Sequence, residues 1–201
     1  MKNSSAAMVI VLTVTTVVVG GILAGFFHLV YPRIEANRIA EEKRAIFAVL
    51  QGAEKYDVIE KEITGAKGKK EVVRIFKGLN AAGETVGYAF IAEGPGFQGT
   101  IKMMVGLNID LKKLTAMKVL EQVETPGLGN KISEARFTDQ FSGLLIEPRI
   151  EYLKNRKPEK PNEIQAVTGA TISSKAVVNG LNGRINIILG ILVAEAKPKE
   201  G

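Results

Sequence analysis

The chain has 201 residues, enough for one membrane helix and one globular domain with its own core. Its composition, 46% hydrophobic and 24% charged with a net charge of +6, is that of a folded protein. It contains one histidine, no cysteine and no tryptophan. This excludes disulfides, thiolate metal ligands, cysteine-bound iron–sulfur clusters, thiol nucleophiles and a histidine-rich metal site. Redox chemistry in this chain would need an organic cofactor.

The basic residues are spread along the chain rather than gathered on one face. The exception is a cluster in a loop that contains proline, formed by Lys154, Arg156, Lys157 and Lys160. Such a run of charge is typical of a solvated surface. Because no aromatic platform or recognition motif accompanies the charge, we expect no nucleic acid partner.

The N-terminal segment is long and apolar enough to cross a membrane. Its apolar part, Ala6–Val30, has 25 residues. As a helix it would extend roughly 37 Å, against a bilayer core of about 30 Å. The cleavage site at Ala24-Gly25-Phe26 is poor and the apolar run continues past it, which favours a retained anchor over a signal peptide. We predict an N-terminal segment and anchor over residues 1–31, with its helix at about 6–30.

The charges that flank this helix bear on its orientation. Only Lys2 and the amino terminus precede it, whereas four basic residues follow: Arg33, Arg38, Lys43 and Arg44. By the positive-inside rule, the part of the chain after the helix would lie in the cytoplasm.

After the anchor, apolar periodicity predicts one helix and then a run of strands. The helix is Arg33–Leu50, with an apolar stripe of Ile34, Ile39, Ile46 and Leu50, and Gly52 follows its end. The expected strands are Tyr56–Ile63, Glu71–Phe76, Thr85–Ala92, Ile101–Ile109 and Leu114–Leu120. In the fourth strand apolar residues alternate strictly with Lys102, Asn108 and Asp110 on the other face, which predicts a half-buried strand.

The C-terminal half is expected to be less regular. We predict a helix over Ser133–Phe141 with Ser133 as its cap, a short strand at Ile164–Val167, and a helix from Ser173 to about Ala194. The order of elements indicates an α+β domain on a mainly antiparallel sheet. The expected organisation is an anchor (1–31), a connecting amphipathic helix (32–52), one domain (53–197) and a tail (198–201).

The segment Ala166–Ser174 carries the clearest chemical signal. Small residues there allow a ligand to approach the backbone, and the following helix presents its N-terminal amides, which favour a phosphate. The side chains of Thr168, Thr171, Ser173, Ser174 and Lys175 add hydroxyl groups and one positive charge. The alternative is an ordinary helix start, in which Ser173 or Ser174 accepts an amide hydrogen bond.

The run Thr168-Gly169-Ala170-Thr171, followed by Ile172-Ser173-Ser174, resembles the flavinylation motif (S/T)-G-A-T of the FMN-binding domain family. The resemblance implies that the hydroxyl of Thr171 is joined to the phosphate of FMN. The family motif often has Asp three residues before its first Ser or Thr, and this chain departs from it with Gln165.

A second resemblance to the same family is independent of the first. The loop Glu124-Thr125-Pro126-Gly127-Leu128-Gly129 matches a family signature, with Lys131 and Phe137 in its continuation. A third, weaker match is the glycine-rich loop Gly94–Gly99 before a long strand. We hypothesise that the Glu124–Gly129 loop packs beside the flavin ring, with its backbone amides as candidate partners for flavin oxygens. Lys131 and Lys175 would offset the phosphate charge.

In length and architecture the chain is most similar to the G subunits of Rnf-type (Rsx) electron-transport complexes. Their relatives, the C subunits of sodium-pumping NADH:quinone reductases, are usually longer. The resemblance implies an electron relay between ferredoxin and NAD in an ion-translocating complex, without a complete activity of its own. It implies other membrane and iron–sulfur subunits as partners and a flavin transferase for maturation. It also implies a single-pass protein of the inner (plasma) membrane with the flavin domain on the periplasmic or outer side, against the charge pattern. The alternatives are a C-type subunit, an anchored sensor module that binds FMN non-covalently, and a structural subunit that has lost its flavin.

Overall fold

The computed structural model describes residues 2–64, 68 and 70–196, so the expected tail lies outside the described residues. The chain divides into two compact units, Met1–Glu41 and Glu42–Gly201, which we describe separately.

The described residues of the N-terminal unit form the first part of helix α1, whose last residues belong to the second unit. This helix is assigned over Lys2–Val49 and contains Pro32, so the expected anchor and connecting helices form one element. Its apolar window has a mean hydropathy of 2.5 with none of it buried, which makes the helix a candidate membrane span by length and composition. Of the expected stripe, Ile34 and Ile39 are exposed, whereas Ile46 and Leu50, in the second unit, are buried.

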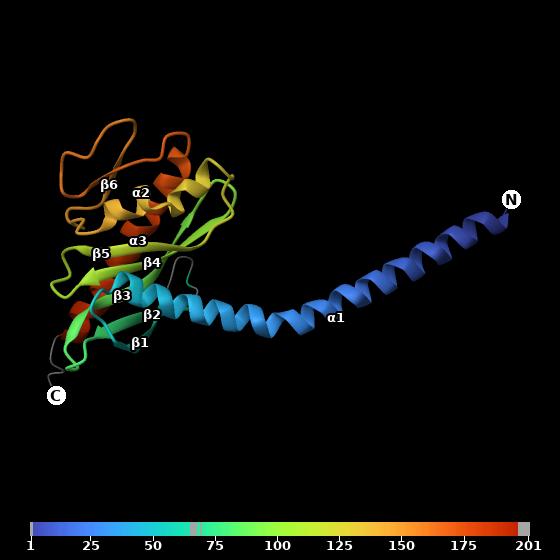
Figure 1. The fold of residues 1–201 in the computed structure, drawn as a ribbon, viewed down its shortest axis with the longest axis horizontal. Helices are drawn as coiled ribbons and strands as arrows, with labels where there is room; N and C mark the ends of the chain where they lie inside the picture. The colour runs from blue at the N-terminus through green and yellow to red at the C-terminus, as the bar shows by residue number, and fades with distance from the viewer. Residues whose placement is uncertain (1, 65–67, 69, 197–201) are drawn as a thin grey trace. The chain divides into compact units, whose positions relative to one another are not determined.

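The second unit is built on a five-stranded antiparallel sheet in which each strand pairs with the next along the chain (Figure 1). Its strands are β1 (Lys55–Thr64), β2 (Lys70–Leu79), β3 (Thr85–Pro95), β4 (Thr100–Asn108) and β5 (Leu114–Glu121). All five were expected from the sequence. A parallel pair, β6 (Glu151–Leu153) and β7 (Glu163–Gln165), forms a second small sheet, and β6 was not expected.

Both faces of the large sheet are covered. On one face Ile101, Met103, Val105 and Leu107 of β4 pack in a cluster that includes residues of α3 (Thr171–Ala196). On the other face Met104 packs with Ala45, Ile46 and Val49 at the end of α1 and with Leu50, which follows the helix. The prediction of a half-buried strand was therefore wrong at its centre, because the end of α1 covers the face that was expected to be polar. Ile109, expected in the strand, lies beyond its end and is exposed.

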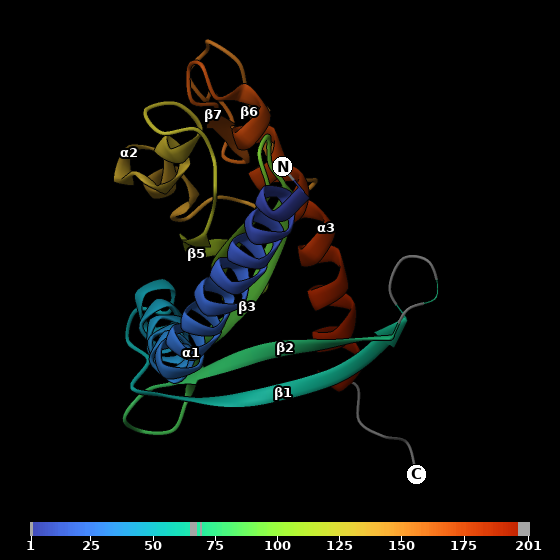
Figure 2. The same ribbon diagram turned by 90° about the vertical axis from the view of Figure 1, so that its right-hand side faces the viewer.

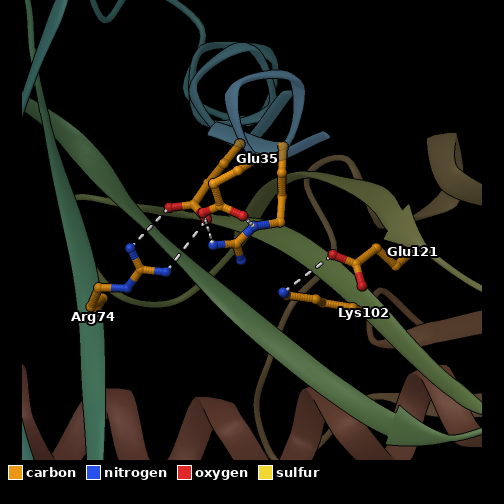
Figure 3. A network of polar contacts seen from close by, with 6 residues as sticks. Glu35, Arg74, Lys102 and Glu121 are labelled. Carbon is orange, nitrogen blue, oxygen red and sulfur yellow. Dashed lines mark hydrogen bonds and ion pairs between the residues drawn. The ribbon is translucent and has the colours of Figure 1, made fainter. Parts of the chain in front are cut away.

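The end of α1 contacts the sheet through backbone as well as side chains. The hydroxyl of Thr115 in β5 donates a hydrogen bond to the carbonyl of Val49. A Cβ added to Gly106 in β4 would stand 2.4 Å from the same carbonyl oxygen, so only glycine fits there. Figure 3 shows two ion pairs nearby: Arg74 of β2 with Glu42 at 3.2 Å, and Lys102 of β4 with Glu121 of β5 at 3.4 Å.

Helix α3 runs along one face of the sheet, as both views show (Figures 1 and 2). Its apolar stretch, Thr171–Glu195, has 25 residues and is long enough to span a membrane, but 39% of its most apolar part is buried inside the domain. Since its side chains, among them Val177, Leu181, Ile185 and Ile188, belong to the main core, α3 is the core helix of this unit.

The segment between β5 and α3, which contains β6 and β7, lies at one end of the large sheet (Figure 2). The expected helix over Ser133–Phe141 is instead three short pieces: η2 (Gly129–Ser133), α2 (Ala135–Thr138) and η3 (Asp139–Phe141). Ser133 ends η2. The N-cap residue of α2 is Glu134, and it makes no side-chain capping bond. The proposed Ser133 cap was thus wrong. The apolar residues Ile132, Phe137 and Phe141 of these pieces are buried.

Candidate functional site

Two glycine turns meet at the N-terminal end of α3. In the first, the amide of Ala170 donates to the carbonyl of Val167 at 2.9 Å, and Gly169 has φ +83°. In the second, the amide of Leu128 donates to the carbonyl of Thr125 at 3.1 Å, with Gly127 at φ +74°. Positive φ at the third position of a turn favours glycine.

These two turns touch each other. A Cβ at Gly169 would lie 3.2 Å from Cδ2 of Leu128. The segments that the sequence analysis singled out separately, Glu124–Gly129 and Thr168–Ser174, therefore form one surface.

Helix α3 begins at Thr171, two residues earlier than predicted. Its first hydrogen bond runs from the amide of Ser174 to the carbonyl of Ala170 at 3.0 Å. Because Ala170 has no side-chain oxygen, it cannot cap the amides of the first turn, which belong to Thr171, Ile172 and Ser173. Amides at this position, together with the helix dipole, attract an anion.

The three hydroxyl groups at the start of α3 have different environments. Ser174 is buried, accepts a hydrogen bond from the amide of Val167 at 3.0 Å and donates to the carbonyl of Ala170 at 3.0 Å. Ser173 is buried and donates to the carboxylate of Glu124. Thr171 is only half-buried, and its hydroxyl has no hydrogen-bond partner among the described residues. Of these three groups, the Thr171 hydroxyl is the one available to a ligand.

Glu124 is a buried carboxylate at the centre of this region, with 4% of its surface exposed. One oxygen accepts the amide of Gln98, in the hairpin between β3 and β4, at 2.9 Å, and the other accepts the hydroxyl of Ser173. Its own amide donates to the side chain of Gln122 at 2.7 Å.

The environment of Glu124 favours its ionised form. Burial raises the pKa of this carboxyl, whereas the hydrogen bonds from the Ser173 hydroxyl and from the amides of Gln98, Phe97 and Gly99 lower it. The balance holds the pKa of Glu124 below its ordinary value, so the group is charged at neutral pH.

Four large apolar side chains are exposed on the segments that form the site. They are Phe97, Val123, Leu128 and Ile172, with exposed fractions between 47% and 65%. Val123 follows the end of β5, and the other three belong to the segments described above. Groups of exposed apolar side chains are typical of surfaces that bind a ligand or another protein.

A cavity of about 660 Å³ opens beside the Thr168 turn. Its charged lining residues are Lys131, Arg136 and Lys157, with the acidic Glu134, so the cavity is basic on balance, and Thr168 and Gln165 also line it. The volume is within the range of about 300–1,000 Å³ that small-molecule sites have.

The predicted site residues occupy one region but differ in exposure. Thr168, Gly169, Lys175, Pro126, Gly127 and Leu128 are exposed; Thr171, Thr125 and Lys131 are half-buried; and Ala170, Ser173, Ser174, Glu124 and Gly129 are buried. The amides of Leu128, Asn130 and Lys131 donate to carbonyls within their own loop, so these three are not free for a ligand.

Three residues of the region were not selected from the sequence for their side chains. Gln98 donates from its side chain to Thr125 at 3.1 Å, in addition to its amide bond to Glu124. The Oδ1 atom of Asn130 is buried and has no partner among the described residues. Gln140 bonds both the amide and the carbonyl of Gln165, at 2.7 and 3.3 Å. The only signal for Gln98 was its place in the Gly94–Gly99 loop, and neither of the other two had one.

Residues 96–186 match the FMN-binding domain family. The match begins at the tip of the β3–β4 hairpin and ends within α3, so it contains all three segments that meet at Glu124. The fold and site thus define an FMN-binding domain.

Two relatives match most of the chain. The G subunit of the ion-translocating oxidoreductase complex of Methanosarcina acetivorans is 30% identical, over 87% of this chain and 92% of that protein. The G subunit of the Na(+)-translocating ferredoxin:NAD(+) oxidoreductase complex of Acetobacterium woodii is 34% identical, over 77% of this chain and 74% of that protein. The chain belongs to the family of G subunits of ion-translocating oxidoreductase complexes, as the sequence resemblance predicted.

A solved structure has the same fold at low identity. The C subunit of the Na(+)-translocating NADH-quinone reductase of Parabacteroides distasonis superposes with a TM-score of 0.58 at 18% identity, over 75% of this chain and 90% of that one. Together with family membership, the apolar α1 supports attachment of the protein to a membrane.

Proposed function

We propose that the protein is the flavin-carrying electron-transfer subunit of an Rnf-type ferredoxin:NAD oxidoreductase complex, with FMN joined by a phosphoester to Thr171. The similarity to two G subunits over most of their length favours this function over a C-type subunit of a quinone reductase. Bound FMN supplies the electron chemistry, and the protein supplies position and environment.

The environment of the Thr171 hydroxyl is the observation that supports attachment at this residue. It is half-buried at the first position of α3 and unbonded within the described residues, whereas the hydroxyls of Ser173 and Ser174 are committed to protein partners. In the attachment step, Oγ1 of Thr171 forms a bond to phosphorus and loses its proton. The phosphoanhydride bond of an activated FMN donor such as FAD breaks, and the nucleoside monophosphate leaves. We infer that a flavin transferase catalyses this step.

The surroundings fit a bound flavin phosphate ester. The first-turn amides of α3 lie where the phosphate would be attached, and they favour its negative charge. The buried Oδ1 of Asn130 offers an acceptor for a flavin hydroxyl or ring N–H. The basic cavity beside Thr168 offers Lys131, from the predicted set, as a counter-charge.

The test is co-expression with the flavin transferase, followed by a denaturing gel viewed under ultraviolet light and by intact-protein mass measurement. Thr171→Val keeps the side-chain shape and removes the hydroxyl, so we expect the fluorescent band and the added mass of one FMN less one water to disappear. Thr64→Val, at the exposed end of β1 and outside the segments of the site, is the control for the same chemical change and should keep both. A band that persists in Thr171→Val contradicts the attachment site. A flavin that washes out of the wild type on acid denaturation favours the non-covalent sensor module.

We also propose that α1 anchors the chain in the plasma membrane with the FMN-binding domain on the outer side. The absence of cysteine makes orientation simple to measure. A single cysteine at the exposed Lys154 should react with a membrane-impermeant maleimide on intact cells. Reaction only after permeabilisation would place the domain in the cytoplasm, as the flanking charges predict.

A further inference from the structure

Glu124 joins three segments that are far apart in the sequence. Its two carboxylate oxygens bond the β3–β4 hairpin through Gln98 and the first turn of α3 through Ser173, and Glu124 itself begins the third segment. The segments are packed so tightly that a Cβ at Gly96 would stand 2.6 Å from Oε1 of Glu124. A Cβ at Gly129 would stand 2.9 Å from the hydroxyl of Ser173. The carboxylate therefore occupies a site closed on several sides by backbone.

The bond to Ser173 has a consequence for Thr171. Residues two positions apart on an α-helix point about 200° away from each other. With Ser173 directed inward to Glu124 and 2% exposed, Thr171 is directed to the opposite side, where it is half-buried. A rotation of the first turn that released Ser173 would carry the Thr171 hydroxyl away from its outward position.

An ionised carboxylate suits this position better than an amide of the same shape. Glu124 accepts hydrogen bonds on both oxygens, one from Ser173 and one from the amide of Gln98. A glutamine has one acceptor oxygen, so its NH₂ group would face one of these two donors. A buried donor left without an acceptor is costly, and bonds to a charged acceptor are the stronger ones.

We propose that Glu124 is a positioning residue for flavin attachment, which acts through Ser173 to hold the first turn of α3 so that Thr171 presents its hydroxyl outward. The inference rests on the proposed function, since it assigns the role of Glu124 in the attachment at Thr171. Glu124 does not touch the reacting hydroxyl; it fixes the backbone that carries it.

The experiment compares Glu124→Gln and Ser173→Ala with Glu163→Gln in the full-length protein. Glu163 is a matched control because it is also a buried carboxylate, and it accepts the amides of Glu159 and Lys160 at 3.0 and 3.1 Å. Purified transferase and FAD are mixed with increasing concentrations of this protein, which is the flavin acceptor. The rate of attachment is measured from the flavin fluorescence that stays with the protein after denaturation. Misplacement of the hydroxyl should lower the saturating rate of both test variants by on the order of tenfold to hundredfold. The KM for the acceptor should stay within about twofold, since the hydroxyl is misdirected while the exposed surface remains.

A second measurement does not depend on flavin. Amide hydrogen exchange should be faster from Ser174 onward in the first bonded turn of α3, where the amide of Ser174 donates to Ala170, in Glu124→Gln and Ser173→Ala, with the strands of the large sheet unchanged. In Glu163→Gln both the exchange of this turn and the transfer rate should equal those of the wild type. A change in global stability alone would not produce this local pattern.

The outcomes separate the two proposals. If the wild type is labelled and Glu124→Gln is labelled at the rate of Glu163→Gln, the positioning role is wrong and the attachment site stands. If Glu124→Gln does not fold, Ser173→Ala decides, and a wild-type rate in that variant overturns the role. If the wild type takes no covalent flavin, or Thr171→Val takes as much, the proposed function falls and the positioning role with it.

Discussion

The carbonyl oxygen of Ala176 in α3 lies against Gly94 in β3, so closely that a Cβ at position 94 would stand 2.1 Å from it. The same crossing places Gly180 of α3 against β3, where a Cβ would stand 2.4 Å from the carbonyl oxygen of Glu93. This backbone contact sets the distance of α3 from the sheet. It therefore fixes where the first turn of the helix meets the two glycine turns.

Gly180→Ala should destabilise the domain by about 1–3 kcal/mol, because the added methyl group forces the helix away from β3. Gly183→Ala, one turn further along the same helix, is the control. A Cβ there meets nothing within 4 Å, so it should stabilise by roughly 0.5–1 kcal/mol through helix propensity. Thermal unfolding in detergent, followed by circular dichroism, measures both. Equal effects of the two substitutions would contradict the close crossing.

The Thr168 turn depends on the left-handed conformation of Gly169. Gly169→Ala should cost about 1–2 kcal/mol, because a residue with a Cβ is strained at φ +83°. Gly169→Asn should cost less, since asparagine tolerates this region better than other side chains. Urea unfolding midpoints of the two variants provide the comparison. The turn is misassigned if alanine proves as well tolerated as asparagine.

Acid should weaken the domain through Glu124 and Glu163, whose pKa values are both lowered. The hydrogen bonds from the amides of Glu159 and Lys160 are the main cause at Glu163, and those from Ser173 and the hairpin outweigh burial at Glu124. A lowered pKa stabilises the folded state above the unfolded value of about 4.3. That contribution is lost as the pH falls below about 4.3 toward the folded pKa. Unfolding midpoints between neutral and acid pH should fall less steeply for Glu124→Gln than for the wild type. Parallel curves would show that this carboxyl does not titrate differently on folding.

The side chain of Asn182 connects α3 to the segment before β6. It accepts the amide of Ile150 at 2.9 Å and donates to the carbonyl of the same residue at 2.8 Å. Asn182→Ala should cost about 1–3 kcal/mol, because it leaves a donor and an acceptor of Ile150 unpaired. Asn179→Ala, on the same helix but exposed, should change the unfolding temperature little. Similar losses in the two variants would argue against this connection.

The large sheet could be predicted from the sequence because its strands are runs of 8 to 11 residues separated by turns, and one of them, β4, alternates with period two. The face of β4 with Ile101 and Met103 is buried as that pattern requires. The coverage of the second face could not be seen, since Met104 alone interrupts the polar residues there. The short strand β6 was missed because its three residues stand in a polar stretch interrupted by proline.

The sequence identified the separate segments of the site but did not predict how they contact one another. The glycine turns have local signatures in the sequence, and in the structure both have positive φ at a glycine, Gly127 and Gly169. The burial of Glu124 depends on Gln98 and on Ser173, which is 49 residues away in the chain. No pattern within one segment reports such a pair. The start of α3 was placed two residues late because Ser173 and Ser174 look like capping residues, whereas one bonds Glu124 and the other the preceding turn.

Thr171 stands at the beginning of α3, which follows all seven strands of the described domain in the chain. Helix α3 contributes many residues to the main core, so the sheet cannot complete that core until this helix has been synthesised and packed. The surface around Thr171 therefore forms only when the whole domain has folded. A modification that requires this shape would mark chains that have completed folding, and unfinished ones would remain unmarked.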